Sequence, residues 1–269
     1  MRLGLLVVLI ATLAVAQERQ VGQGLNFYSR EKEAAFGAQL AQEVRQRTTS
    51  LDSVVVRDFV EQIGRKLTAQ LPDAGISYTF TVIADDVNGS THEPISLPGG
   101  YIFVPASLIL TSQNEAECAG MLAHSIAHVA ARHGTRQATR AEAAGVPLVF
   151  TGGWVGNGGA VPLGFLSFQR AFEAEADAVA VQMTWSAGYD PWALVRYIGR
   201  VQPESTKPNA FSPLRSRESR IASMEKAIQE LSLKSYLSSD EFPRIQGEVR
   251  RLTPNQVRRT PSLLHPNED

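Results

Sequence analysis

The feature that most constrains the fold of this chain is the segment from Gln113 to His133, which has the apolar spacing of one long helix. Ser112, with Glu115 three residues later, matches a capping box at the start of a helix, and Gly134 supplies a stop at its end. The sequence therefore predicts one long helix over residues 113–133. The same reasoning predicts a second long helix over about residues 168–187.

Two histidines on the first predicted helix are spaced as metal ligands. His124 and His128 stand four residues apart, which places both imidazoles on one face of a helix, about one turn from each other. Two ligands of one tetrahedral zinc ion need this arrangement. The spacing alone is a weak indication, because histidine pairs at this distance also occur on helices that bind no metal.

The second predicted helix carries acidic residues at the same four-residue spacing. Glu173 can complete a zinc site, and Asp177 can accept the free N–H of a ligating histidine and fix its tautomer. The alternative is an exposed acidic helix face paired with Arg170. The apolar residues that follow favour a helix that is largely packed away, and buried carboxylates are costly unless they are paired or bound to metal.

The rest of the chain alternates between helical and strand patterns. Further helices are predicted at residues 29–47, 54–71, 191–201 and 217–231, and strands at 78–83 and 101–104, with a turn-rich segment at 85–98. We predict an α+β fold, in which a mainly helical domain surrounds a small antiparallel sheet and the metal lies between the two long helices.

The first residues have the pattern of a signal peptide. An uncharged apolar run from Leu3 to Val15 follows Arg2, and it is too short to span a bilayer. We predict cleavage after Ala16 and a periplasmic or secreted protein, with an uncleaved anchor in the inner membrane as the alternative. One domain is expected over residues 17–252, followed by a proline-containing, poorly ordered tail over 253–269.

Composition excludes some functions and leaves one segment open. With 26 Lys plus Arg against 27 Asp plus Glu, nucleic acid is not an expected partner. The basic clusters at 132–140 and 250–259 are interpreted as solvated helix faces. Cys118 has no partner for a disulfide and is interpreted as a small buried apolar residue. The uncharged, glycine-rich segment 143–169 is expected to form a mobile flap, with membrane contact as the alternative.

Six blocks, in matching order, resemble the zinc metallopeptidases of the CAAX prenyl protease and HtpX type, particularly their soluble exported bacterial members. These blocks lie at residues 26–33, 97–104, 114–117, 124–134, 173–177 and 187–191. The resemblance implies a zincin-like fold that holds one zinc ion through His124, His128 and Glu173, with Asp177 supporting a ligand from behind. It also implies a substrate-binding strand beside the cleft, formed by Gly100, Tyr101, Ile102 and Phe103, which pairs with an extended substrate.

The chain departs from this family pattern at two positions. The family has a glutamate directly after the first histidine, which acts as the general base in peptide hydrolysis, and here that position is Ser125. A serine hydroxyl is far too weakly basic to take a proton near neutral pH, and losing a general base costs about 10²–10⁴-fold in rate. The family histidine expected near the zinc is replaced by Leu214.

Three functions remain open from the sequence. The resemblance implies an exported metalloendopeptidase that acts on unfolded or misassembled envelope proteins, with activity weak or lost at Ser125. The alternative is a pseudopeptidase that binds zinc and a peptide or partner protein without hydrolysis. The third is a purely structural zinc site, which predicts destabilisation on chelation but no peptide binding.

Overall fold

A computed structural model describes the backbone of residues 21–22, 24–84, 92–145, 163–202, 215–236 and 239–254, and the side chains of all of these except 163–169. In chain order the elements are α1 (Arg30–Arg47), α2 (Val54–Thr68), β1 (Thr79–Ile83), β2 (Ile95–Leu97), the short 3-10 turn η2 (Pro98–Gly100), β3 (Tyr101–Pro105), α3 (Ala106–Thr111), α4 (Glu115–Ala130), α5 (His133–Ala144), α6 (Leu163–Ser186), α7 (Trp192–Val201), α8 (Arg217–Gln229) and α9 (Phe242–Leu252). The predicted α+β fold is confirmed.

The small sheet is mixed, which corrects the expected antiparallel arrangement. Its strand order is β1-β3-β2, with β1 parallel and β2 antiparallel to β3. The tight η2 turn reverses the chain directly from β2 into β3, so these two strands must be antiparallel. The connection from Ile83 to Tyr101 is long enough for the crossover that a parallel pair needs.

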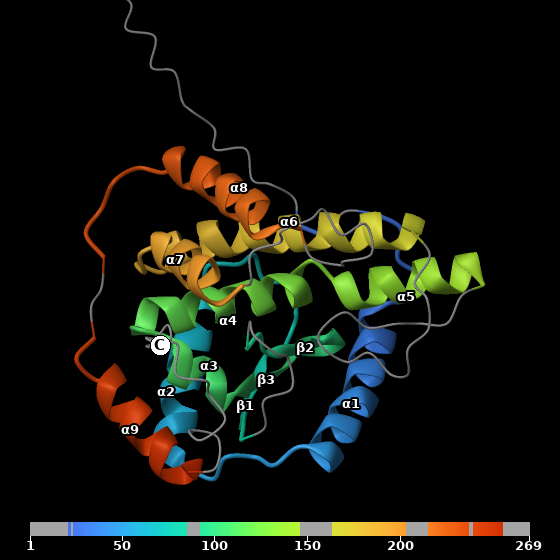
Figure 1. Cartoon of the computed structure of the whole chain (residues 1–269). Coiled ribbons are helices and arrows are strands. Elements are labelled where there is room, and N and C mark those ends of the chain that lie inside the picture. Colours follow the sequence, from blue (N-terminus) through green and yellow to red (C-terminus); the bar gives the residue numbers. More distant parts are fainter. Residues whose placement is uncertain are drawn as a thin grey trace, which may run out of the picture.

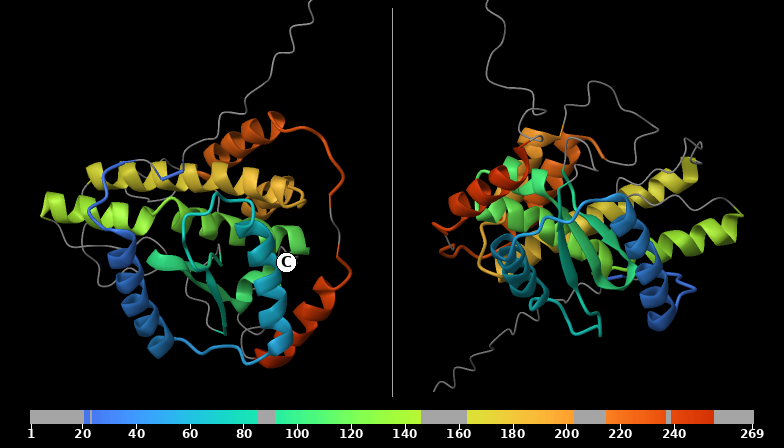
Figure 2. Two further views of the ribbon diagram at one scale, coloured as in Figure 1. Left: turned by 180° about the vertical axis from the view of Figure 1, so that it is seen from behind. Right: turned by 90° about the horizontal axis from the view of Figure 1, so that it is seen from below.

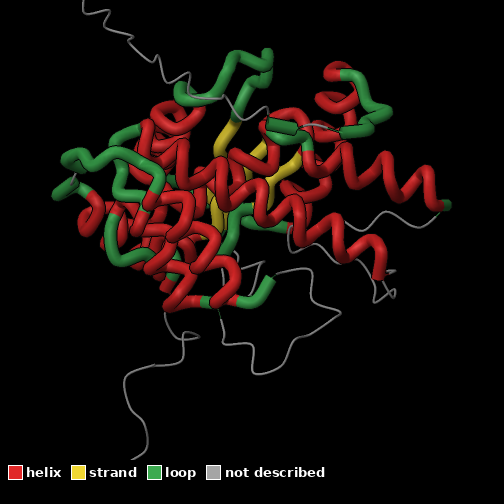
Figure 3. Tube along the Cα trace, turned by 90° about the horizontal axis from the view of Figure 1, so that it is seen from above, coloured by secondary structure: helices red, strands yellow, loops and turns green. Residues whose placement is uncertain are grey.

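Helix α4 is the centre of the molecule. Every residue from Glu117 to Val129 is buried. Helix α6 packs along one side of α4, and the sheet and α2 pack against its other sides. Figure 1 shows α6 above α4 and the sheet below it, with α1 and α2 on either side of the sheet. Seen from above in Figure 3, helices cover the strands. Side chains on α4 therefore have little access to solvent unless a cleft reaches them.

Both ends of α4 differ from the sequence prediction. The N-cap is Asn114, whose side chain accepts from the backbone N–H of Glu117, whereas the Ser112 hydroxyl donates back to the carbonyl of Leu108 in α3. The helix ends at Ala130, before Gly134. Two residues after this end, Arg132 adopts the left-handed conformation, with φ of 57°, and is the N-cap of α5. Arg132 is fixed in this conformation because it donates to Glu33 at 2.6 Å and to the carbonyl oxygen of Tyr28.

The N-terminal segment before α1 lies against α5, a helix that the sequence did not predict. The side-chain amide of Asn26 donates to the hydroxyl of Thr135, and the backbone N–H of Phe27 donates to Thr139. The first turn of α1 is capped by Ser29, whose hydroxyl accepts from the backbone N–H of Lys32. In Figure 2, α5 and the first half of α6 extend from the body in the same direction.

Several predictions concern residues that the structure does not describe. These are the signal peptide with its cleavage after Ala16, most of the segment 143–169, the position of Leu214 and the tail from residue 255. They stay predictions, as do the domain limits. Within the described ranges, no helix is both long enough and apolar enough to span a bilayer. Cys118 is 1% exposed, and burial raises the pKa of its thiol to about 12.

Candidate metal centre

The packing of α6 along α4 brings together the three residues predicted as metal ligands. Nε2 of His124 lies 3.1 Å from Nε2 of His128, because the two rings project from successive turns of one helix. The Glu173 carboxylate faces both rings, with 3.4 Å from Oε2 to His124 Nε2 and 3.6 Å from Oε1 to His128 Nε2. Glu173 is 5% exposed, so the alternative of an exposed acidic helix face is wrong for this residue.

A fourth side chain at this point was not predicted. Glu93 lies in the segment just before β2, and its Oε1 is 3.4 Å from Nε2 of His124. One donor atom from each of Glu93, His124, His128 and Glu173 lies within 4.8 Å of all the others, which makes the four a possible metal-binding group. Sequence spacing gave no signal for Glu93, because it comes from an irregular segment.

Asp177, which the sequence suggested as the support of a ligating histidine, lies next to His124. Its Oδ1 lies 3.0 Å from Nδ1 of His124, and a carboxylate at this distance favours a proton on Nδ1. Arg220 donates to both Asp177 oxygens, at 2.9 and 2.7 Å, and is 1% exposed. Although burial opposes ionisation, this guanidinium holds the pKa of Asp177 well below its usual range.

A second chain of contacts orients His128. Burial lowers the pKa of His133 to about 4, so its ring is neutral near pH 7. Its Nε2 lies 3.1 Å from the Glu175 carboxylate, which can only accept, and its Nδ1 lies 3.1 Å from Nδ1 of His128. The proton of His133 is therefore on Nε2, its Nδ1 is an acceptor, and the proton of His128 is on Nδ1.

The basic cluster at 132–140, which was interpreted as a solvated helix face, takes part in these contacts, so that interpretation is wrong for Arg136. Arg136 is 6% exposed and donates to Glu175 at 3.1 Å. Its guanidinium also lies over the ring of Phe172, 4.7 Å from the ring centroid. The first part of α5 is therefore a buried support for the histidines, which explains why its polar residues lack the exposure of a solvated helix face.

The cluster as built needs a positive charge at its centre. Nε2 of His124 and Nε2 of His128 lie 3.1 Å apart, and the buried Oε2 of Glu173 has no hydrogen-bond partner among the described residues. Although burial opposes charge on His124, the carboxylates of Glu93, Asp177 and Glu173 raise its pKa well above the usual value. Imidazole nitrogens with carboxylate oxygens are a donor set that suits zinc. The residues present therefore fit a divalent metal ion.

Ser125 lies directly beside this cluster on α4. It is completely buried, and its hydroxyl oxygen has no hydrogen-bond partner within the described part of the chain. No described contact increases its basicity. The structure thus offers nothing at this position that compensates for the missing carboxylate.

The strand predicted to bind substrate lies in the middle of the sheet. β3 pairs with β1 along one edge and with β2 along the other, so the main chain of Tyr101, Ile102 and Phe103 has no edge left for a substrate strand. This corrects the expected strand pairing. Any role of Gly100 or these three residues in substrate contacts stays a prediction. β2, which packs against α4, has no second backbone partner among the described residues.

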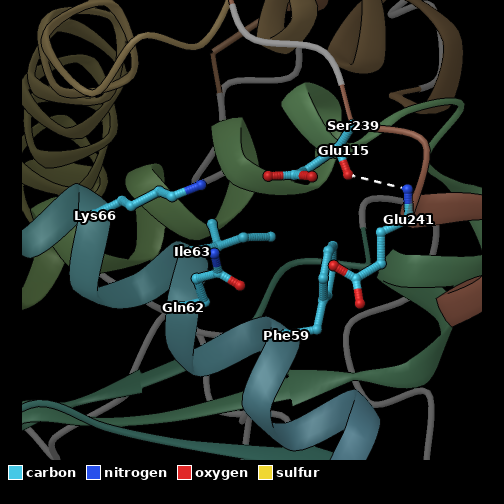
Figure 4. A pocket seen from close by; sticks show the side chains of 7 residues that line it. All are labelled: Phe59, Gln62, Ile63, Lys66, Glu115, Ser239 and Glu241. Carbon is cyan, nitrogen blue, oxygen red and sulfur yellow. Dashed lines mark hydrogen bonds between the residues drawn. The ribbon is translucent and has the colours of Figure 1, made fainter.

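Figure 4 shows a small pocket between α2, the first turn of α4 and the segment before α9. Its lining residues are Phe59, Gln62, Ile63, Lys66, Glu115, Ser239 and Glu241. One carboxylate oxygen of Glu115 accepts a hydrogen bond from the Tyr189 hydroxyl at 2.8 Å, so this side chain has a structural partner. Since Glu115 and His124 stand nine residues apart on α4, roughly 14 Å along the helix axis, this pocket is separate from the metal cluster.

The chain is similar to several proteins named as proteases. It is 26% identical over 191 residues to a "Putative beta-barrel assembly-enhancing protease" of Vibrio cholerae, which covers 65% of this chain and 38% of that protein. It is 23% identical over 258 residues to the "Beta-barrel assembly-enhancing protease" of Escherichia coli K12, covering 86% and 48%. It is also 25% identical over 202 residues to the "Mitochondrial metalloendopeptidase OMA1" of Schizosaccharomyces pombe, covering 70% and 59%.

The chain therefore spans less than half the length of these bacterial relatives and somewhat more than half of the yeast protein. A model of the family described as "Peptidase family M48" matches residues 60–239, which include both histidines, Ser125 and the acidic residues of α6. The resemblance to zinc metallopeptidases is confirmed by this match, and the chain belongs to peptidase family M48.

Proposed function

We propose that this protein is a zinc-binding pseudopeptidase of the cell envelope, which binds unfolded or misassembled envelope proteins and hydrolyses them weakly or not at all. The observation that carries this proposal is the convergence of His124, His128 and Glu173 on one point directly beside a buried serine. The ligand geometry supports metal binding. Ser125 supports the loss of hydrolysis, because it cannot serve as the general base.

The names of the relatives support the location and the partner class. Proteins named beta-barrel assembly-enhancing proteases match most of this chain, which favours an envelope polypeptide as the ligand. The predicted signal peptide is consistent with export, after which cleavage near Ala16 would release the protein into the periplasm. Retention by an uncleaved N-terminal segment is the alternative.

We propose that the polypeptide binds along the outer edge of β2. Ile95, Ser96 and Leu97 form the strand of the sheet that packs against α4, and Glu93 of the metal cluster lies two residues before it. An extended peptide added there would gain main-chain hydrogen bonds and pass close to the metal. Specificity would come from side-chain contacts beyond the strand itself.

The test is to measure binding and cleavage together on protein purified after export and loaded with zinc. A fluorescently labelled, unfolded β-barrel protein is expected to bind, and binding is expected to weaken when zinc is removed by a chelator. Cleavage of the same substrate is expected to be about 10²–10⁴-fold slower than acid–base catalysis by a glutamate would allow. Rapid cleavage that chelation stops would contradict the proposal, and so would zinc binding with no affinity for the polypeptide.

A further inference from the structure

Glu93 occupies a place in the metal cluster that its position in the sequence did not suggest. We propose that Glu93 is a fourth protein ligand, which closes the coordination sphere and leaves no position for water or a substrate oxygen. The inference rests on the metal binding contained in the proposed function. According to this inference, hydrolysis is blocked in two ways: Glu93 fills the fourth coordination position of the metal, and Ser125 cannot act as the general base.

The separations of the two carboxylates from His124 match one tetrahedral site. With ligand distances of about 2.0–2.2 Å, neighbouring donor atoms of tetrahedral zinc stand about 3.3–3.6 Å apart. The separation from Glu93 Oε1 to His124 Nε2 is 3.4 Å, equal to the separation from Glu173 Oε2 to the same nitrogen. The two histidine nitrogens are 3.1 Å apart, slightly less than this range. Glu93 and Glu173 therefore lie at the same distance from Nε2 of His124.

The short distance to His124 favours a ligand over a replacement general base. A base acts on a water molecule that lies between it and the metal, so its oxygen stands farther from the other ligands than they stand from one another. Glu93 Oε1 shows no such extra separation from His124. Its donor atom also lies within 4.8 Å of those of both His128 and Glu173, as all four lie of one another.

Exposure and charge support the same assignment. The His124 side chain is fully buried and that of Glu173 is 7% exposed, whereas that of Glu93 is 16% exposed. Glu93 is therefore the most exposed of the four side chains, ahead of His128 at 10%, as expected of a residue on the solvent side of the cluster. With neutral histidines, the two carboxylates of Glu93 and Glu173 balance the charge of one divalent cation, which lowers the cost of burying it.

The test uses cobalt(II) in place of zinc, because zinc has no visible absorption. Glu93→Ala and Glu93→Gln are compared with the wild type and with Glu142→Gln, a matched change at an exposed residue of α5. Loss of a residue that only supports a ligand costs about 10–100-fold in metal affinity, so removal of a ligand is expected to cost at least about 100-fold. Acetohydroxamate is expected to change the cobalt spectrum of Glu93→Ala, which has an open position, and of Glu93→Gln, whose amide oxygen is a weak ligand that can be displaced, but not that of the wild type.

The outcomes separate this inference from the function on which it rests. If the wild type binds cobalt but acetohydroxamate changes its spectrum as readily as that of Glu93→Ala, and the affinities are equal, the fourth-ligand assignment is wrong while metal binding stands. If the wild type binds no metal, the proposed function itself fails. If Glu93→Ala does not fold, Glu93→Gln decides, because it preserves the size of the side chain while weakening the ligand.

Discussion

Replacing Arg220 with leucine is expected to lower the free energy of unfolding by about 3–5 kcal/mol, the usual cost of removing one partner of a buried ion pair. Arg220 is 1% exposed and donates to both oxygens of Asp177, which is itself buried. Leucine fills much of the space but leaves the Asp177 carboxylate without its strongest partner. Urea denaturation of the metal-free protein measures the change without a contribution from metal binding.

Two further variants make the Arg220 result specific to the ion pair. Lys226→Leu changes an exposed cation on the same helix, α8, and is expected to have little effect. The double variant Asp177→Asn with Arg220→Leu is expected to lose less stability than the sum of the two single variants, because the buried charge is gone. Additive losses would show that Arg220 acts through packing alone, contrary to our account.

Restoring a carboxylate at position 125 is expected to give the largest gain in activity. Because we propose that Glu93 closes the site, the comparison is between Glu93→Ala and the double variant Glu93→Ala with Ser125→Glu, both loaded with zinc. A correctly placed general base is worth about 10²–10⁴-fold, so peptide hydrolysis should increase by that factor in the double variant. Initial rates with a quenched fluorescent peptide measure the gain.

The control for this gain is Ser125→Gln with Glu93→Ala, which has nearly the same shape as the glutamate variant but no basic oxygen of comparable strength. Metal content and unfolding of each variant are measured first, because position 125 is completely buried and must accept a larger side chain. Adding Leu214→His tests the second departure from the family pattern. No gain from the triple variant, with metal bound and hydroxamate accepted, would show that Ser125 does not limit hydrolysis.

Most of the long elements could be predicted from apolar spacing, and the missed elements have physical explanations. β2 is three residues long and lies in a segment rich in turn residues, so its extended form depends on pairing with β3. The parallel pairing of β1 with β3 likewise depends on where the chain places β3, which the spacing of residues within β1 does not indicate. Helix α9 did carry a readable signal, since Phe242, Ile245 and Val249 repeat at helical spacing and are all buried.

Some residues of the candidate site could likewise be predicted from the sequence, and others could not. Helical spacing was sufficient to bring His124 and His128 to one face, and burial of α6 was sufficient to direct Glu173 toward them. Glu93 could not be found this way, because an irregular segment has no period that fixes where its side chains point. Arg220 was missed for another reason: a basic residue on an amphipathic helix usually faces solvent, whereas this one is buried with Asp177 and Gln202 as acceptors.

The most direct test of the account is to measure the metal content and metal affinity of the purified protein and of two ligand variants. We expect one zinc ion per chain in the wild type and in the control Glu142→Gln. We expect zinc to be lost from His124→Ala and Glu173→Ala, although both variants should still fold. A wild type that holds no metal after incubation with zinc, or ligand variants that retain it with unchanged affinity, would contradict the convergence of these side chains on a metal ion.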